Sequence, residues 1–256
     1  MATTTTERSA TPTPIQARPG GRGPWFLELY RTAVGKKYVM AVTGIIGMLF
    51  LVGHTVGNLK LYLGTVGHHY DIDLYGEFLR EILVPILPRT IFLWILRGGL
   101  ITAIGLHIHA AWSLTRLNHK ADIKYYSKRD YVAASFASRT MRWTGIIVEA
   151  FILFHLSDLT WGFANGDFIR GHVHHNLIQS MRRPPVALLY VVANLALGVH
   201  LWHGAWSLFQ SLGWNRPRFN RWRSWFAWGF TAFIVIGNLS FPILIAAHVV
   251  KDATVS

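Results

Sequence analysis

The segment Val199–Gly213 reads VHLWHGAWSLFQSLG and places two histidines, His200 and His203, three residues apart inside a long apolar run. A histidine at membrane depth is energetically costly, and where one occurs it usually faces the interior of a helix bundle and has a functional role. Imidazole is also a common ligand of iron. The segment therefore raises the question of whether other apolar runs carry histidines at matching depths.

The composition favours a membrane protein. Of the 256 residues, 52% are hydrophobic and only 14% are charged, whereas soluble domains carry about 25% charged residues. Residues 1–24 are rich in Thr, Pro and Gly and are predicted to form a disordered tail. They lack an apolar segment ending in a small-residue cleavage site, so they do not read as a secretory signal peptide. Because the chain has no cysteine, it alone can build neither a disulfide nor a thiolate-held iron–sulfur cluster.

Five apolar segments follow the tail, and each is long enough for the roughly 20 residues that a membrane-spanning helix needs. Backbone groups in lipid must be satisfied within the segment, so each is predicted to be a helix. The predicted spans are residues 38–63, 91–114, 143–163, 186–212 and 225–250. We therefore predict an all-α integral membrane protein, with residues 25–256 as one five-helix domain.

The basic residues indicate the orientation of these helices. Seventeen Lys and Arg residues lie in the N-terminal segment and in the connections after the second and fourth spans, against eight on the other side. The positive-inside rule then places the N-terminus in the cytoplasm and the C-terminus outside. The net charge of +13 is accordingly interpreted as a topology signal, and no nucleic acid is expected as a partner.

Two histidines are predicted to share a depth in the outer half of the membrane. His54 lies 17 residues beyond Lys37 in the first span, or about 25 Å from the inner end at 1.5 Å per residue. His155 lies 13 residues beyond Arg142 in the third span, or about 20 Å. They form a candidate outer pair.

The second and fourth spans run inward and offer a candidate inner pair. His107 and His109 lie roughly 10–14 Å from the inner end of the second span, and His203 in the fourth span matches that level, with His200 beside it. Four helices that supply histidines at two levels are what two stacked bis-histidine haems require. The alternative for each histidine is a packed side chain hydrogen-bonded to a neighbouring helix. Six further histidines lie in connections and are expected in solvent: His68, His69, His119, His172, His174 and His175.

Three other charges are predicted at membrane depth: Arg97, Glu149 and Asp158, of which Asp158 lies one turn beyond His155 and has extension to the outer interface as its alternative. Arg97 in the second span could pair with a haem propionate or extend to the outer interface. Glu149 in the third span needs a partner or a proton, and proton transfer or quinone binding are its candidate roles. The connection Tyr70–Arg89 is amphipathic and predicts a short helix at the outer interface.

With these residues in place, the chain resembles the single-chain, five-helix, dihaem cytochrome b membrane anchor of succinate dehydrogenase and fumarate reductase, particularly its actinobacterial members. The matching stretches are GHTVGNLKLYLG, DLYGEFLREILVPILP, LHIHAAWSLT, FHLSDLT, ANLALGVHLWHGAWSLFQSLG and GNLSFPI. Together they extend over roughly Trp25 to Val250 and leave only the N-terminal tail outside the resemblance.

The resemblance implies a subunit of a bacterial plasma-membrane complex that belongs to the tricarboxylic acid cycle and the respiratory chain. A flavoprotein and an iron–sulfur subunit would dock on the cytoplasmic side, and electrons from succinate would pass through this chain to menaquinone. Its helices 1–4 would form a bundle around two haem b groups. The succinate-oxidising site would lie in a partner, and a higher oligomer is left open.

The resemblance also implies the iron ligands. His54 and His155 would hold the outer haem, and His107 and His203 the inner one. His107 is preferred over His109 because the family ligand lies eleven residues before the asparagine found here at 118. His203 is preferred over His200 because the family ligand directly precedes a glycine, here at 204. Where some fumarate reductases carry a glutamate for a proton path, this chain has Leu201, so that path is not carried over.

Alternatives to this interpretation concern the cofactor and the class of protein. A Rieske-type [2Fe–2S] centre uses two histidines on one iron, and its cysteines would have to come from a partner subunit. The chain could also anchor another oxidoreductase, such as a hydrogenase or formate dehydrogenase, or be a histidine-bearing transporter without a redox centre.

The quinone site has two candidate locations. The first is the inner end of the first span, at Arg31, Lys36 and Tyr38, and the second is the outer connection near Glu77 and Glu81.

Overall fold

The computed structural model describes residues 23–121, 134–214 and 216–250. The expected tail over residues 1–24 lies almost wholly outside the described residues. Within the described part, five helices are long and apolar enough to cross a membrane. They cover Ala33–Leu63, Ile91–Asn118, Thr140–Trp161, Pro184–Ser211 and Pro217–Ala246. The chain thus has the helices of a multi-pass membrane protein, as its sequence predicts.

Most of the described residues are helical, and the single sheet has two short strands. The order of elements is α1 (Trp25–Arg31), α2 (Ala33–Asn58), η1 (Leu59–Leu63), β1 (Thr65–Val66), β2 (His69–Tyr70), α3 (Asp71–Glu81), α4 (Ile91–Ala121), α5 (Ala134–Leu156), η2 (Ser157–Trp161), α6 (Val173–Met181), α7 (Pro184–Ser211), η3 (Pro217–Phe219) and α8 (Asn220–Ala246). Several helices extend beyond the apolar runs that predicted them, because a helical backbone satisfies its own hydrogen bonds whatever the polarity of its side chains.

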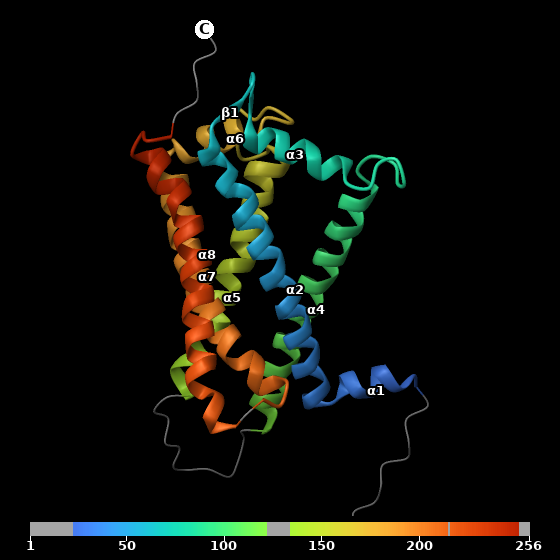
Figure 1. Cartoon of the computed structure of the whole chain (residues 1–256). Helices are drawn as coiled ribbons and strands as arrows, with labels where there is room; N and C mark the ends of the chain where they lie inside the picture. The colour runs from blue at the N-terminus through green and yellow to red at the C-terminus, as the bar shows by residue number, and fades with distance from the viewer. Residues whose placement is uncertain (1–22, 122–133, 215, 251–256) are drawn as a thin grey trace, which may run out of the picture.

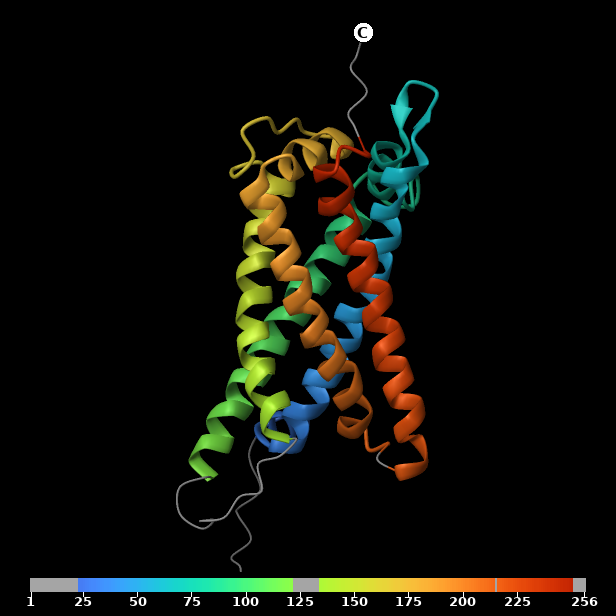
Figure 2. The same ribbon diagram turned by 90° about the vertical axis from the view of Figure 1, so that its left-hand side faces the viewer.

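The long helices pack in neighbouring pairs. Helix α7 lies along α8, α2 along α4, and α5 along α7, while α2 also contacts α7 and α8 (Figures 1 and 2). Helix α4 runs down at an angle from the end of the molecule that carries α3 (Figure 1). Helices α2, α4, α5 and α7, which carry the predicted histidines, are therefore linked by direct contacts.

Helix α1 lies across the base of the molecule, beside the lower end of α2 (Figure 1). Thr32 separates the two helices in an extended conformation, and its hydroxyl accepts a hydrogen bond from the Gly35 amide at 2.9 Å. The buried Lys36 ammonium donates to the carbonyls of Tyr30 and Arg31 at 3.0 and 3.1 Å. These carbonyls end α1, where a cation is favoured by the helix dipole, so Lys36 ties α1 to α2.

The opposite end is covered by the β1–β2 hairpin and by α3 and α6 (Figure 1). Helix α3 is the short helix predicted within the connection Tyr70–Arg89. An ion pair of 2.7 Å joins Lys60 to Asp71 at the start of α3. The main cluster of buried apolar residues also lies at this end and draws on η1, α3, α6, α7 and α8: Leu61, Ile72, Leu177, Ile178, Met181, Tyr190, Phe241 and Ile245.

The outward faces of the long helices are apolar. Leu49 of α2, Ile101 of α4 and Ile236 of α8 are each more than two-thirds exposed. Apolar surface of this extent is uncommon on soluble monomers, whereas a helix surrounded by hydrocarbon needs no polar face. The exposed apolar surface and the lengths of the spans therefore both indicate a lipid environment.

Candidate functional site

The first pair of histidines joins α2 to α5. The ring centroids of His54 and His155 lie 5.8 Å apart, with the two ring planes nearly perpendicular at 84°. Phe50, one turn before His54, stacks on its ring at 5.2 Å, and Phe151 contacts His155 at 5.7 Å. The structure thus brings together the two histidines that were expected to share the outer level.

The second pair joins α4 to α7. The ring centroids of His107 and His200 lie 6.4 Å apart. Nδ1 of His107 lies 3.0 Å from the hydroxyl of Thr43 on α2. Nδ1 of His200 lies 3.3 Å from the hydroxyl of Thr144 on α5. All four helices therefore meet at this level.

The two pairs lie at separate levels along the bundle. Thr43, which contacts the second pair, precedes His54 by eleven residues on α2, and Thr144 precedes His155 by eleven residues on α5. Eleven residues of helix rise about 16 Å. Since two different helices give the same spacing, the two histidine pairs are stacked about 16 Å apart.

The remaining candidate histidines lie beside the second pair. His203 of α7, which the resemblance favours over His200, lies one turn further along α7 and contacts Trp202 at 4.6 Å. Its Nε2 atom is buried without a hydrogen-bond partner. His109 of α4 is exposed and forms a hydrogen bond with the Tyr30 hydroxyl of α1 through Nδ1 at 2.5 Å. The ring that faces His107 is therefore that of His200, while His203 keeps an unsatisfied nitrogen.

The spacing within each pair fits a shared metal ion. Among the described residues, no group of three or more His, Asp or Glu side chains converges; the histidines meet in twos. Two imidazoles on opposite sides of one ion, with metal–nitrogen bonds of about 2.0–2.1 Å, put their ring centres about 6–6.5 Å apart. The 6.4 Å between His107 and His200 lies within this range, and the 5.8 Å between His54 and His155 lies just below it. Because the macrocycle supplies the other iron ligands of a haem, two axial histidines complete such a site.

Glycines leave room beside the second pair. A Cβ atom added at Gly44 of α2 would lie 3.6 Å from Cε1 of His107, and one added at Gly145 of α5 would lie 3.5 Å from Cε1 of His200. Each glycine directly follows the threonine that contacts the same ring, at Thr43 and Thr144. The two imidazoles therefore lie over matching Thr–Gly steps of two different helices.

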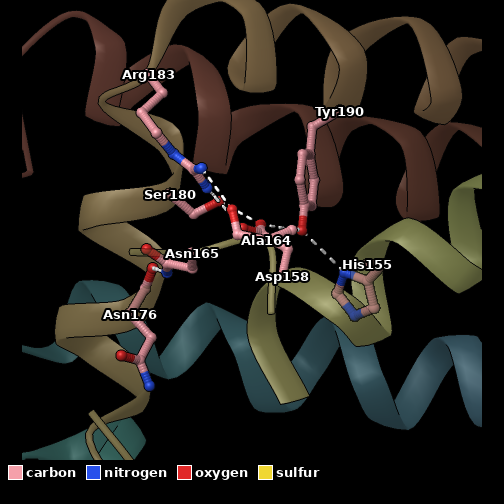
Figure 3. A network of polar contacts seen from close by, with 8 residues as sticks. All are labelled: His155, Asp158, Ala164, Asn165, Asn176, Ser180, Arg183 and Tyr190. Carbon is pink, nitrogen blue, oxygen red and sulfur yellow. Dashed lines mark hydrogen bonds and ion pairs between the residues drawn. The ribbon is translucent and has the colours of Figure 1, made fainter. Parts of the chain in front are cut away.

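A buried polar network extends from the first pair toward α6 (Figure 3). Asp158 lies in the π-helical turn η2 and is fully buried. Its Oδ1 accepts from Arg183 Nη2 at 2.6 Å, and its Oδ2 accepts from the Tyr190 hydroxyl at 2.9 Å and from the Ser180 hydroxyl. The Tyr190 oxygen in turn lies 3.2 Å from Nδ1 of His155. A continuous chain of contacts therefore connects His155 to Arg183.

Arg97 and Glu149 both lie on exposed helix faces. The Arg97 guanidinium stacks on Trp94 of its own helix at 4.9 Å. Glu149 lies on α5 between Thr144 and His155 in the sequence, but on the exposed side of the helix. The structure therefore does not bring these two charges into the space between the paired histidines.

The inner quinone candidates gather where α1 meets α2. Arg31 ends α1 and is exposed, Tyr38 of α2 is 43% exposed, and Lys36 is buried against the end of α1. The Tyr30–His109 hydrogen bond lies beside them and joins α1 to α4. This end therefore offers hydrogen-bonding groups near the second histidine pair.

The outer quinone candidates take part in ion pairs at the end of α3. Glu77 pairs with Arg80 at 2.6 Å and also with Arg89, and Glu81 lies 3.6 Å from Arg89. Glu77 is half-buried and Glu81 is exposed, and both join α3 to the segment that leads into α4. These ion pairs indicate a structural role for Glu77 and Glu81.

One expectation about the connections is wrong. His174 was expected in solvent, but it is 2% exposed and stacks on Tyr70 with a ring separation of 3.4 Å. Its backbone amide donates to Asp73 of α3 at 2.9 Å. The connection between α5 and α7 folds back over α3 through α6, which buries residues that a loop would have exposed. The side chain of His119 lies outside the described residues.

Sequence reasoning missed the two threonines, although a signal for them exists. The stretch Thr–Gly–Ile–Ile occurs at residues 43–46 and again at 144–147, each time eleven residues before a candidate histidine. The two copies are 101 residues apart. In both copies the threonine contacts a histidine of the next membrane-spanning helix. Thr43 of α2 contacts His107 of α4, and Thr144 of α5 contacts His200 of α7.

Comparisons with models of protein families, with curated proteins and with solved structures found no match. The assignment of function therefore depends on the paired histidines and on the motifs that carry the resemblance.

Proposed function

We propose that this chain is the membrane anchor and electron-transfer subunit of a succinate dehydrogenase, passing electrons from an iron–sulfur subunit to menaquinone. The observation that carries the proposal is the pair of facing histidines at each of two levels, His54 with His155 and His107 with His200. A stack of two one-electron centres across a membrane is what an electron-transfer anchor needs. The resemblance supplies the enzyme to which such an anchor belongs.

The residues that would hold the two haem b groups come from four helices. His54 and His155 would hold the outer haem, and His107 would hold the inner haem together with one histidine of α7. Geometry favours His200 for that place, and the resemblance favours His203. When bound, each haem iron accepts and releases one electron. The chain itself sets the spacing of the two centres through the eleven-residue separation on α2 and α5.

The side on which partners dock follows from charge. The end that carries α1 also carries the C-terminal ends of α4 and α7 (Figure 1). Most Lys and Arg residues lie beside these helix ends in the sequence, and the positive-inside rule makes this end cytoplasmic in a bacterial plasma membrane. We propose that the flavoprotein and iron–sulfur subunits bind there. The C-terminus then lies outside, because α8 ends at the opposite end from α1 (Figure 1).

The quinone head group is proposed to bind at the junction of α1, α2 and α4. A quinone carbonyl needs a hydrogen-bond donor, and Tyr30, Lys36 and His109 concentrate donors there. Glu77 and Glu81 at the opposite end have guanidinium partners, which favours the inner location.

The test is a reduced-minus-oxidised visible spectrum of the complex purified from its membrane, together with single histidine variants. We expect two haem b signals. His54→Ala and His155→Ala each remove the outer signal, His107→Ala removes the inner signal, and His69→Ala on the exposed hairpin removes neither. A wild-type spectrum without a haem b band would refute the dihaem form and leave the Rieske-type or transporter alternatives.

Co-purification decides which enzyme the anchor serves. We expect a subunit with bound flavin and succinate-dependent quinone reduction in the same fraction. A haem-containing preparation that reproducibly carries a hydrogenase or formate dehydrogenase instead would overturn the assignment to succinate dehydrogenase while keeping the electron-transfer role.

A further inference from the structure

Three of the paired histidines share one feature that the proposed function does not require. In His107, His200 and His155 the Nδ1 atom contacts a hydroxyl oxygen, at 3.0, 3.3 and 3.2 Å. A neutral imidazole carries its proton on one nitrogen only, and the hydrogen bond at the other nitrogen decides which. The direction of these three hydrogen bonds therefore determines which nitrogen is free to bind a metal.

The direction can be derived for His107 from the other contacts of Thr43. The Thr43 hydroxyl donates its hydrogen to the Val39 carbonyl at 2.7 Å, with a second contact to the Met40 carbonyl at 3.2 Å. A hydroxyl has one hydrogen and two lone pairs. Since that hydrogen is already engaged, the Thr43 oxygen can only accept from His107, whose proton must then lie on Nδ1.

The same geometry recurs on α5. The Thr144 hydroxyl donates to the Thr140 carbonyl at 2.7 Å and contacts the Met141 carbonyl at 3.3 Å. Its oxygen is therefore left to accept from Nδ1 of His200. In both Thr–Gly–Ile–Ile stretches, therefore, the threonine hydroxyl donates to a carbonyl of its own helix and its oxygen faces an imidazole of another helix.

In His155 the Nδ1 atom faces a tyrosine hydroxyl, that of Tyr190, and the same reasoning places the proton on Nδ1. The Tyr190 hydroxyl donates to Oδ2 of Asp158 at 2.9 Å, and the carboxylate is paired with Arg183. An ion-paired carboxylate only accepts hydrogen bonds, so the hydrogen of Tyr190 is engaged. The Tyr190 oxygen then accepts from Nδ1 of His155 (Figure 3).

We propose that Thr43, Thr144 and Tyr190 are positioning residues that hold His107, His200 and His155 as Nδ1-protonated tautomers and leave Nε2 as the metal-binding nitrogen. The engaged hydroxyls orient the rings before any metal binds. A hydrogen bond that accepts the Nδ1 proton also makes the imidazole a stronger electron donor to a metal on Nε2. This last consequence rests on the proposed haem function, whereas the tautomers do not.

Redox titration of the purified complex tests the consequence for the metal. In Thr43→Val the side chain keeps its shape but loses the acceptor, so the inner centre should shift to a higher midpoint potential, or retain haem about 10- to 100-fold more weakly. Thr43→Ser should restore the wild-type potential. Tyr190→Phe should move only the outer centre.

A matched control is available on α4. The Thr102 hydroxyl also donates to a carbonyl one turn earlier, that of Gly98 at 2.8 Å, but Thr102 is exposed. Thr102→Val should therefore leave both potentials unchanged. Two results would overturn the proposal. One is a Thr43→Val variant with the potentials and the haem retention of the wild type, and the other is the same change in Thr102→Val as in Thr43→Val.

The tautomers can be measured even if the preparation contains no haem, which separates this inference from the proposed function. In protein labelled with ¹⁵N-histidine, imidazole shifts report which nitrogen carries the proton. We expect His107, His200 and His155 to carry the proton on Nδ1, and one of these three signals to be lost in each of Thr43→Val, Thr144→Val and Tyr190→Phe, which also assigns the signals to their residues. Protonation of these three rings at Nε2 in the wild type would refute the proposal whatever the cofactor content.

Discussion

The carboxylate of Asp158 offers the sharpest test of how the outer end of the bundle is held together. It is fully buried and accepts hydrogen bonds from Arg183, Ser180 and Tyr190. Replacing it with asparagine keeps the size of the side chain but removes the charge and turns one acceptor oxygen into a donor group. At least one of the three donors then faces another donor.

The expected magnitude follows from these contacts. Breaking a buried ion pair by changing one partner costs about 3–5 kcal/mol. The Arg183 side chain is 38% exposed and keeps a second acceptor, the Ala164 carbonyl at 2.6 Å, so solvent reduces the cost to the lower end, about 3 kcal/mol. For a chain of this size, 1 kcal/mol corresponds to roughly 2–4 °C in Tm. Asp158→Asn should lower Tm by about 6–12 °C.

The assay is thermal unfolding of the purified protein in detergent, with Asp167→Asn as the matched control. Asp167 lies in the connection between η2 and α6 and its side chain is exposed, so its variant should unfold within about 0.5 kcal/mol of wild type. Combining Asp158→Asn with Arg183→Met should cost less than the sum of the single changes, because the two residues share one interaction. A Tm for Asp158→Asn equal to that of Asp167→Asn would refute the reasoning.

Two further predictions concern packing within the bundle. A Cβ at Gly237 of α8 would lie 2.6 Å from Cγ2 of the buried Thr55, whose β-branched side chain has little freedom to move. Gly237→Ala should therefore lower the free energy of unfolding by about 1–3 kcal/mol. Gly47→Ala, where the added Cβ meets open space, should leave the free energy of unfolding unchanged. Lys36→Met should leave the last carbonyls of α1, including that of Tyr30, without the Lys36 hydrogen bonds. Because a charged hydrogen bond contributes about 1.5–3 kcal/mol, the rate of amide hydrogen exchange in α1 should rise by about tenfold or more. An unchanged rate would contradict the inference that Lys36 holds α1 against α2.

The sequence by itself determined the membrane helices and the depths of the histidines. Apolar runs of about 20 residues have few ways to satisfy their backbone in lipid, so the five spans could be located without a structure. Charges at the span ends provided fixed points from which a rise of 1.5 Å per residue placed His54 and His155 at one outer level. Depth along a helix axis depends only on counting residues, which is why this part of the site was predictable.

Rotation about each helix axis could not be obtained in the same way. His200 and His203 are about 60° apart on α7 by helical geometry, and the sequence left them as alternatives; packing against α4 and α5 is what brings His200 opposite His107. The same packing turns Glu149 outward, although it lies at membrane depth, and buries His174, although it lies in a connection.

Only the tertiary structure showed what lies behind the histidine rings. Thr43, Thr144 and Tyr190 are distant in sequence from the rings they contact. The repeated Thr–Gly–Ile–Ile stretch marks the two threonines, but it does not show which ring each hydroxyl faces. Their roles arise where a hydroxyl whose hydrogen is already engaged meets an imidazole from another helix. The sequence therefore determined at which level each histidine lies, and tertiary packing decided which hydroxyl faces Nδ1 of His107, His200 and His155.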